Sequence, residues 1–154
     1  MVDRFERFSY AIFDISRSWH KIASEVMEEY GLKGAHSVYL TALSRYPEGL
    51  TSPMLCKICG KDKADVSRSM NLMEEKGLVI KQGSNQNKYN GVFCLTDLGI
   101  TIAETVRKKI DLAVSLAGGA LTERDRAVFY ECLENIAENL RKISTDGLKE
   151  SNEE

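Results

Sequence analysis

The chain has 154 residues, of which 43% are hydrophobic and 29% are charged, and its net charge is −2. This length suits one domain with a buried core, and the composition is that of an ordinary soluble globular protein. No apolar run approaches the roughly 18 residues that would span a membrane. The charged segment 1–10 lacks the apolar core of a signal peptide. We therefore expect a cytoplasmic protein.

The first segment has an apolar residue at every third or fourth position, up to a break near Gly31. This heptad spacing predicts a long helix that packs lengthwise on other helices. Burial in the protein's own core and a dimer interface would both explain it. We favour the dimer, because the helix is long and the last helical segment carries a similar stripe. The interface residues expected from the two segments are Phe5, Phe8, Ile12, Phe129, Leu133, Ile136 and Leu140.

The middle of the chain predicts a helix-turn-helix. A helix is expected over 34–46, and Thr51 is placed to cap the next one, which begins at Ser52-Pro53. After a turn at Gly60-Lys61, Asp62 is a suitable N-cap for a further helix. Val66, Met70 and Met73 give that helix one apolar stripe, and Gly77 ends it.

The opposite face of this helix is polar and carries Lys63, Ser67, Arg68 and Asn71. Arginine offers two donors to guanine, and asparagine offers a donor and an acceptor to adenine. The segment 57–88 has a net charge of +3, against −5 for the remainder. A basic region on an acidic body is typical of a local DNA contact, although a mixed solvated surface would have the same charge.

Two strands, over 78–80 and 92–95, flank a polar loop and complete a wing. Thr96 is the expected cap of the next helix, which ends at Gly118-Gly119. Segment 121–125 has a capping-box variant before the last helix. The expected fold is mainly α with a two- or three-stranded β wing. We expect a single domain over 1–154, with a winged-helix lobe at 32–99, dimerisation helices at 1–30 and 100–145, and a frayed acidic tail at 146–154.

These features together resemble the MarR family of bacterial transcriptional regulators over about residues 5–143. The third helix has Cys56 where the family has a small alanine. The most specific matching patterns are Asp62-x3-Val66-Ser67-Arg68-x4-Met73-x3-Gly77-Leu78-Val79 and Leu95-Thr96-x2-Gly99.

The resemblance implies a homodimer that binds an inverted-repeat operator and is released by a small anionic or phenolic ligand, or by thiol oxidation. The wing loop departs from the family pattern, because segment 84–90 has one lysine and no arginine. This predicts wing binding that is weaker than is typical or that depends on a different contact. The expected DNA-binding residues are Lys61, Lys63, Ala64, Asp65, Ser67, Arg68, Asn71, Asn87 and Lys88.

Other candidate sites have competing explanations. Cys56 and Cys59 form a C-x-x-C pair that suits core packing better than thiol sensing or a metal, since a structural zinc site needs four ligands. Core positions are also expected for Cys94 and Cys132. The side chains Trp19, His20, His36 and Tyr39 suit either a ligand pocket or ordinary helix packing.

The sequence contains no catalytic motif, phosphate-binding loop or metal-binding pattern that we can identify, so we expect neither an enzyme nor a cofactor. The main alternative to a DNA-binding regulator is a helical dimer that uses the winged surface to bind a protein. The acidic body and the weakly basic wing give that alternative some support. A regulator switched by Cys56 and Cys59 is the other variant.

Overall fold

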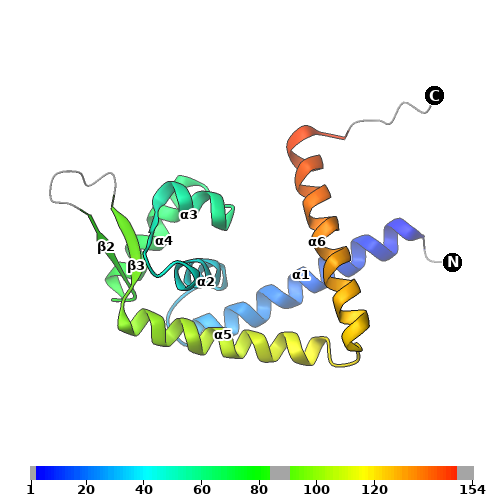
Figure 1. The fold of residues 1–154 in the computed structure, drawn as a ribbon, viewed down its shortest axis with the longest axis horizontal. Helices are drawn as coiled ribbons and strands as arrows, with labels where there is room; N and C mark the ends of the chain where they lie inside the picture. Colours follow the sequence, from blue (N-terminus) through cyan, green and yellow to red (C-terminus); the bar gives the residue numbers. More distant parts are fainter. Residues whose placement is uncertain (1–2, 84–90, 149–154) are drawn as a thin grey trace. The chain divides into compact units, whose positions relative to one another are not determined.

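The computed structural model describes residues 3–83 and 91–148, which fall into two compact units, Met1–Ala113 and Val114–Glu154. Figure 1 shows the elements in chain order. They are α1 (Arg4–Glu28), the 3-10 helix η1 (Gly34–His36), α2 (Ser37–Arg45), β1 (Leu50–Thr51), α3 (Ser52–Cys59), α4 (Lys63–Glu75), β2 (Val79–Gln82), β3 (Val92–Leu95), α5 (Asp97–Ala117) and α6 (Glu123–Asp146). The expected α-rich fold with a small β wing is confirmed.

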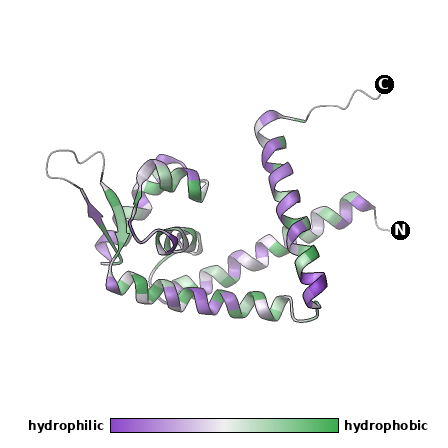
Figure 2. Ribbon diagram, viewed as in Figure 1, coloured by the Kyte–Doolittle hydropathy of each residue, from purple (hydrophilic) through white to green (hydrophobic). Residues whose placement is uncertain are grey.

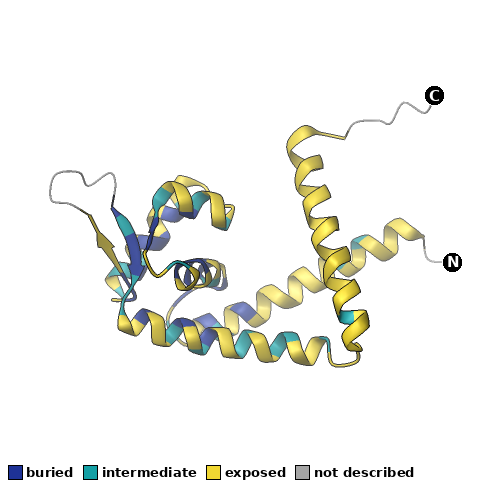
Figure 3. Ribbon diagram, viewed as in Figure 1, coloured by how far each residue is buried: buried dark blue, intermediate teal, exposed yellow. Residues whose placement is uncertain are grey.

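The core of the first unit lies in the winged-helix lobe. Buried side chains from α2, α3, α4 and the strands form a single cluster, and the end of α1 adds Met27. Figure 3 shows the buried residues gathered there. The predicted stripe of α4 supplies three of the completely buried side chains, Val66, Met70 and Met73. Burial of about 1.5–3 kcal/mol per large apolar side chain holds α4 on the lobe.

The sheet has three antiparallel strands in the order β1-β3-β2. Leu50 pairs with Phe93, and Val79 pairs with Leu95. The strand expected over 78–80 is displaced, since β2 covers Val79–Gln82, while β3 is as predicted. The two-residue β1 has too few residues to give an alternating pattern. The sheet places the wing beside α4 in Figure 1.

The predicted helix starts are confirmed by hydrogen bonds. The side chains of Thr51, Asp62 and Thr122 each accept from the backbone N–H three residues further on. Thr96 Oγ1 likewise accepts from the N–H of Gly99. The helix expected over 34–46 is divided, because its first turn is the 3-10 helix η1. The tail was expected to begin at residue 146, but α6 includes Asp146, so any tail begins after it. Residues 149–154 lie outside the described residues.

The long helices carry apolar side chains that the rest of their unit leaves uncovered. Phe5 is 72% exposed, and α6 has no buried residue at all. Figure 2 shows hydrophobic residues recurring along both helices. Cys132 is exposed rather than buried as expected, because α6 packs no side chain into a core. Within the described ranges, no helix is both long and apolar enough to cross a membrane.

Candidate nucleic-acid interface

The polar face of α4 is open to solvent. Lys63, Ser67, Arg68 and Asn71 are all exposed, and so is Ala64 between them. Spacings of four, five and eight residues from Lys63 put these side chains along one side of the helix, away from Val66 and Met70. The exposure that DNA contact requires is therefore present. Contact with DNA stays a prediction for each of them.

The amino end of α4 is capped by the protein's own carboxylate. Asp62 Oδ1 accepts from the N–H of Asp65 at 2.8 Å, and Gly60 makes the turn before it in the left-handed conformation, with φ of 62°. Lys61 lies half-buried in that turn. Because Asp62 occupies a free N–H of the first turn, Lys61 is the residue of this turn whose charge suits a DNA phosphate, and that contact stays a prediction.

One predicted contact residue is oriented differently from the others. Asp65 is half-buried, and its carboxylate accepts a hydrogen bond of 2.5 Å from the hydroxyl of Tyr39 in α2. The buried Ser69 donates to the same oxygen at 3.3 Å. The hydrogen bond from Tyr39, with help from the charge of Lys61, lowers the pKa of Asp65. Asp65 is therefore ionised at neutral pH and tied to the protein's own interior.

Two predicted contacts, Asn87 and Lys88, lie outside the described residues. At the base of the wing, the ammonium of Lys81 lies 5.3 Å from the centre of the Phe93 ring. Lys81 is exposed, and this cation–π contact holds it on the sheet. Lys81 is a basic residue near the interface that the sequence reasoning counted only as part of the net charge.

The C-x-x-C pair lies on α3. Both thiols are free and half-buried, and Cys59 Sγ approaches the carbonyl oxygen of Val38 at 3.9 Å. Burial raises the pKa of Cys59, which makes its reactive thiolate scarcer at neutral pH. Both cysteines pack against the hydrophobic core, as the core-packing interpretation expects. In the ranges that the structure covers, no group of three or more potential ligands could hold a metal ion.

The four side chains considered for a ligand pocket do not share one environment. Trp19 and His20 are exposed on α1, whereas His36 and Tyr39 are buried. His36 Nδ1 accepts from the N–H of Lys33 at 3.0 Å, and burial lowers the pKa of His36. These bonds fit the packing interpretation for His36 and Tyr39, and ligand binding by the four residues stays untested.

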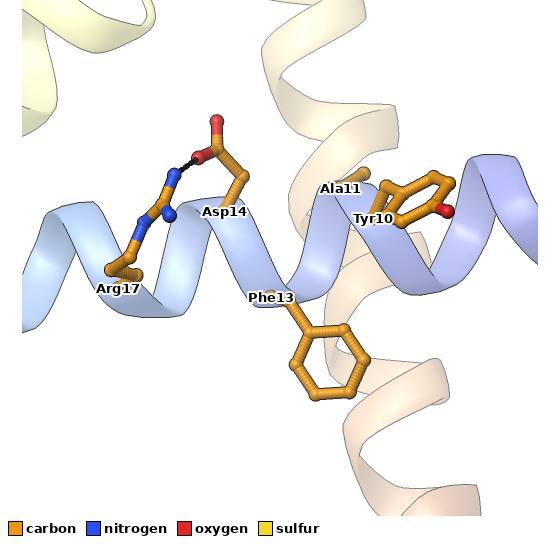
Figure 4. A pocket seen from close by; sticks show the side chains of 5 residues that line it. All are labelled: Tyr10, Ala11, Phe13, Asp14 and Arg17. Carbon is orange, nitrogen blue, oxygen red and sulfur yellow. Dashed lines mark hydrogen bonds and ion pairs between the residues drawn. The ribbon is translucent and has the colours of Figure 1, made fainter.

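Two surface hollows bear on the question of a small ligand. One, of about 500 Å³, lies along α1 and is lined by Tyr10, Phe13, Asp14 and Arg17. Figure 4 shows Phe13 pointing to the side opposite the Asp14–Arg17 ion pair, so these side chains do not converge on a common ligand.

The second hollow, of about 650 Å³, lies between the end of α2 and the first half of α5. Its walls combine apolar and charged side chains, including Ile100, Arg45, Glu104 and Arg107. This hollow lies at the C-terminal end of α2, whereas Tyr39 lies near the N-terminal end of that helix. No sequence signal indicated this cavity, because its lining comes from segments about 60 residues apart.

The fold and the exposed polar helix define the class of winged helix-turn-helix proteins. Residues 30–88 match the MarR family sequence model. This match covers the lobe from the end of α1 to the wing. Together with the shared fold described next, it confirms the resemblance to the MarR family. No curated protein matches the chain.

Solved structures share the fold along nearly the whole chain. A protein from Listeria monocytogenes, described as a MarR family transcriptional regulator and solved with a 26mer DNA, is 24% identical with a TM-score of 0.76, covering 98% of this chain and 99% of that one. A MarR regulator from Methanosarcina mazei is 22% identical with a TM-score of 0.78, covering 90% and 99%. MepR, a regulator of a Staphylococcus aureus multidrug efflux pump, is 21% identical with a TM-score of 0.68, covering 86% and 98%.

Proposed function

We propose that this protein is a DNA-binding transcriptional regulator that acts as a homodimer on a palindromic operator in the bacterial cytoplasm. The observation that carries the proposal is the exposed polar face of α4. This face carries exposed lysine, serine, arginine and asparagine side chains, and the opposite face of the helix is buried in the core. Such a helix fits the major groove, where arginine and asparagine distinguish bases. The DNA complex of the similar Listeria protein supports the same role.

The proposed dimer is supported by the uncovered apolar faces of α1 and α6. In proteins most of the stability of a helix comes from packing of its amphipathic face, and α6 has no buried residue, so its apolar stripe needs a partner. A second copy of the chain is the occupant that a palindromic site requires, because a two-fold axis relates both the half-sites and the subunits. The exposed apolar residues proposed for this interface are Phe5, Phe8, Phe129, Leu133, Ile136 and Leu140, together with the half-buried Ile12.

A small aromatic or anionic effector would act by favouring one spacing of the two DNA-reading lobes over another. Its effect is limited by the difference between its affinities for the two spacings. The α2–α5 hollow has the size and the mixture of apolar and charged walls that small ligands use. We infer no ligand identity from it.

The proposal is tested by titrating the DNA upstream of the protein's own gene with wild-type protein and with Arg68→Ala at several salt concentrations. Arg68→Ala should weaken specific binding by about 1–3 kcal/mol if Arg68 reads a base edge. Arg17→Ala is the matched control, since Arg17 is exposed on α1 and pairs with Asp14. Equal affinity of wild-type protein for the upstream fragment and for unrelated DNA would reject the proposal and favour the protein-binding alternative.

A further inference from the structure

Among the described residues of the predicted DNA face, Asp65 has a side chain that is hydrogen-bonded to another helix. Its Oδ1 accepts from Tyr39 Oη at 2.5 Å and from Ser69 Oγ at 3.3 Å. Tyr39 is completely buried and Ser69 is 4% exposed. A hydrogen bond between an ionised carboxylate and a buried hydroxyl is short and strong, so this contact fixes the carboxylate in one orientation.

The position of Asp65 in α4 lets this contact act on the start of the predicted recognition helix. Asp65 lies in the first turn, where its own N–H is capped by Asp62. Arg68 and Ser69 follow within one turn, on adjacent faces. The buried stripe of α4 fixes the helix on the lobe, and a bond from α2 to this turn adds a constraint on rotation at the end that carries Arg68.

The contact also controls charge at the interface. A carboxylate free to rotate outward beside Arg68 would compete with DNA for the guanidinium and would repel phosphate. Lys61 and Arg68 both stabilise the ionised form of Asp65, so they lie within its electrostatic reach. Holding the carboxylate against Tyr39 leaves both cations available to an outside anion.

We propose that Asp65 is a positioning residue, and that the Tyr39–Asp65 hydrogen bond sets the orientation of the recognition helix and keeps the carboxylate off the DNA surface. This proposal rests on the proposed function, because it assigns a role within the DNA interface. The sequence suggested that Asp65 contacts DNA directly. In this proposal Asp65 acts on DNA binding through Arg68 instead. Tyr39 then has a role in operator recognition although it is too deeply buried to touch DNA.

The test is a double-mutant cycle on Tyr39→Phe and Asp65→Asn. Affinity is measured for a duplex that the wild-type protein selects from a random pool and for a scrambled duplex of the same composition. Tyr39→Phe should weaken binding to the selected duplex about three- to tenfold and change binding to the scrambled duplex less than twofold. The double variant should be no weaker than the weaker single variant, because both changes break one interaction.

Tyr46→Phe is the matched control, since Tyr46 is a half-buried tyrosine at the end of the same helix α2. It should bind like wild-type protein. Circular dichroism at the assay temperature establishes that each variant is folded. Should Tyr39→Phe not fold, the cycle of Asp65→Asn with Ser69→Ala replaces it, and coupling between those two changes is the expected result.

Three results would overturn the proposal. Tyr39→Phe could bind the selected duplex within twofold of wild-type protein. The two changes could add independently, in the original cycle or its replacement. Asp65→Asn could select a duplex that differs at one base position, which would make Asp65 a direct reader. Failure of the wild-type protein to prefer any selected duplex would instead contradict the proposed function itself.

Discussion

At the scale of single residues, the outward face of α4 combines exposed cations with one carboxylate, that of Asp65, which is hydrogen-bonded to Tyr39. The apolar stripe of α4 fixed the exposed side of the helix, so Lys63 and Arg68 were placed correctly. Asp65 has the same local pattern as its exposed neighbours, yet its partner Tyr39 lies 26 residues away. Since nothing in helical periodicity records a bond between two helices, this contact required the structure.

Gly99 is a residue whose need for glycine is explained by the fold. A Cβ added there would lie 2.0 Å from the carbonyl oxygen of Leu78, where α5 crosses the start of the wing. Gly99→Ala should destabilise the protein by about 1–3 kcal/mol through overpacking. Chemical denaturation measures the change in the free energy of unfolding.

Gly119→Ala is the control for this prediction. A Cβ at Gly119 would lie 3.4 Å from its nearest neighbour, the carbonyl oxygen of Leu116, which is ordinary packing. A stability of Gly99→Ala equal to that of Gly119→Ala would contradict the close approach of α5 to Leu78.

His36 should make stability depend on pH. Burial, aided by the charge of Lys33, lowers the pKa of His36 in the folded state. A histidine with a lowered folded pKa contributes stability above its unfolded pKa of about 6.5, and that contribution is lost as pH falls through the folded value. The denaturant concentration at the unfolding midpoint of wild-type protein should therefore decrease as the pH is lowered from 7.5 to 5.5. In His36→Asn this dependence of the midpoint on pH should be smaller.

The other histidine in the chain, His20, is exposed on α1 and serves as the control. His20→Asn should keep the wild-type pH profile. A profile that flattens equally in both variants would show that the buried imidazole of His36 is not the titrating group.

At the scale of elements, periodicity and caps predicted most helices, because both signals are local. The start of α4 at Asp62 and of α6 at Thr122 followed from residue types alone. The division of the segment 34–46 into η1 and α2 did not, since the buried Gly34 lies against Ser24 of α1 and that contact is tertiary. β1 was missed because its pairing with β3 joins segments about 40 residues apart.

The apolar stripe of α6 carries a prediction about assembly. Ile136→Asp should raise the dimer dissociation constant about 100-fold or more, because each of two symmetry-related sites loses roughly 1.5–3 kcal/mol of apolar burial. Analytical ultracentrifugation over a concentration series measures this.

Asn135→Asp adds the same charge to the neighbouring position, turned about 100° around the helix away from the stripe. This variant should remain dimeric. Two variants that dissociate alike, or a wild-type protein that is monomeric throughout, would contradict a dimer interface on α6.

At the scale of the whole molecule, the proposed dimer carries two outward-facing α4 helices. The sequence suggested this arrangement through resemblance, and the match over residues 30–88 and the shared fold bear out its winged-helix part. Two such helices on one dimer would enter successive major grooves on one side of a duplex, about 10 base pairs apart. The two-fold symmetry of the proposed dimer therefore predicts an operator with two symmetry-related half-sites.

The most direct test of the central claim is selection of binding sites from random duplex DNA by the full chain, followed by measurement of stoichiometry on the selected sequence. We expect an inverted repeat with half-sites about one helical turn apart, bound by two chains, and a loss of that preference in Arg68→Ala. A pool in which no sequence is enriched, or a single half-site bound by one chain, would contradict it.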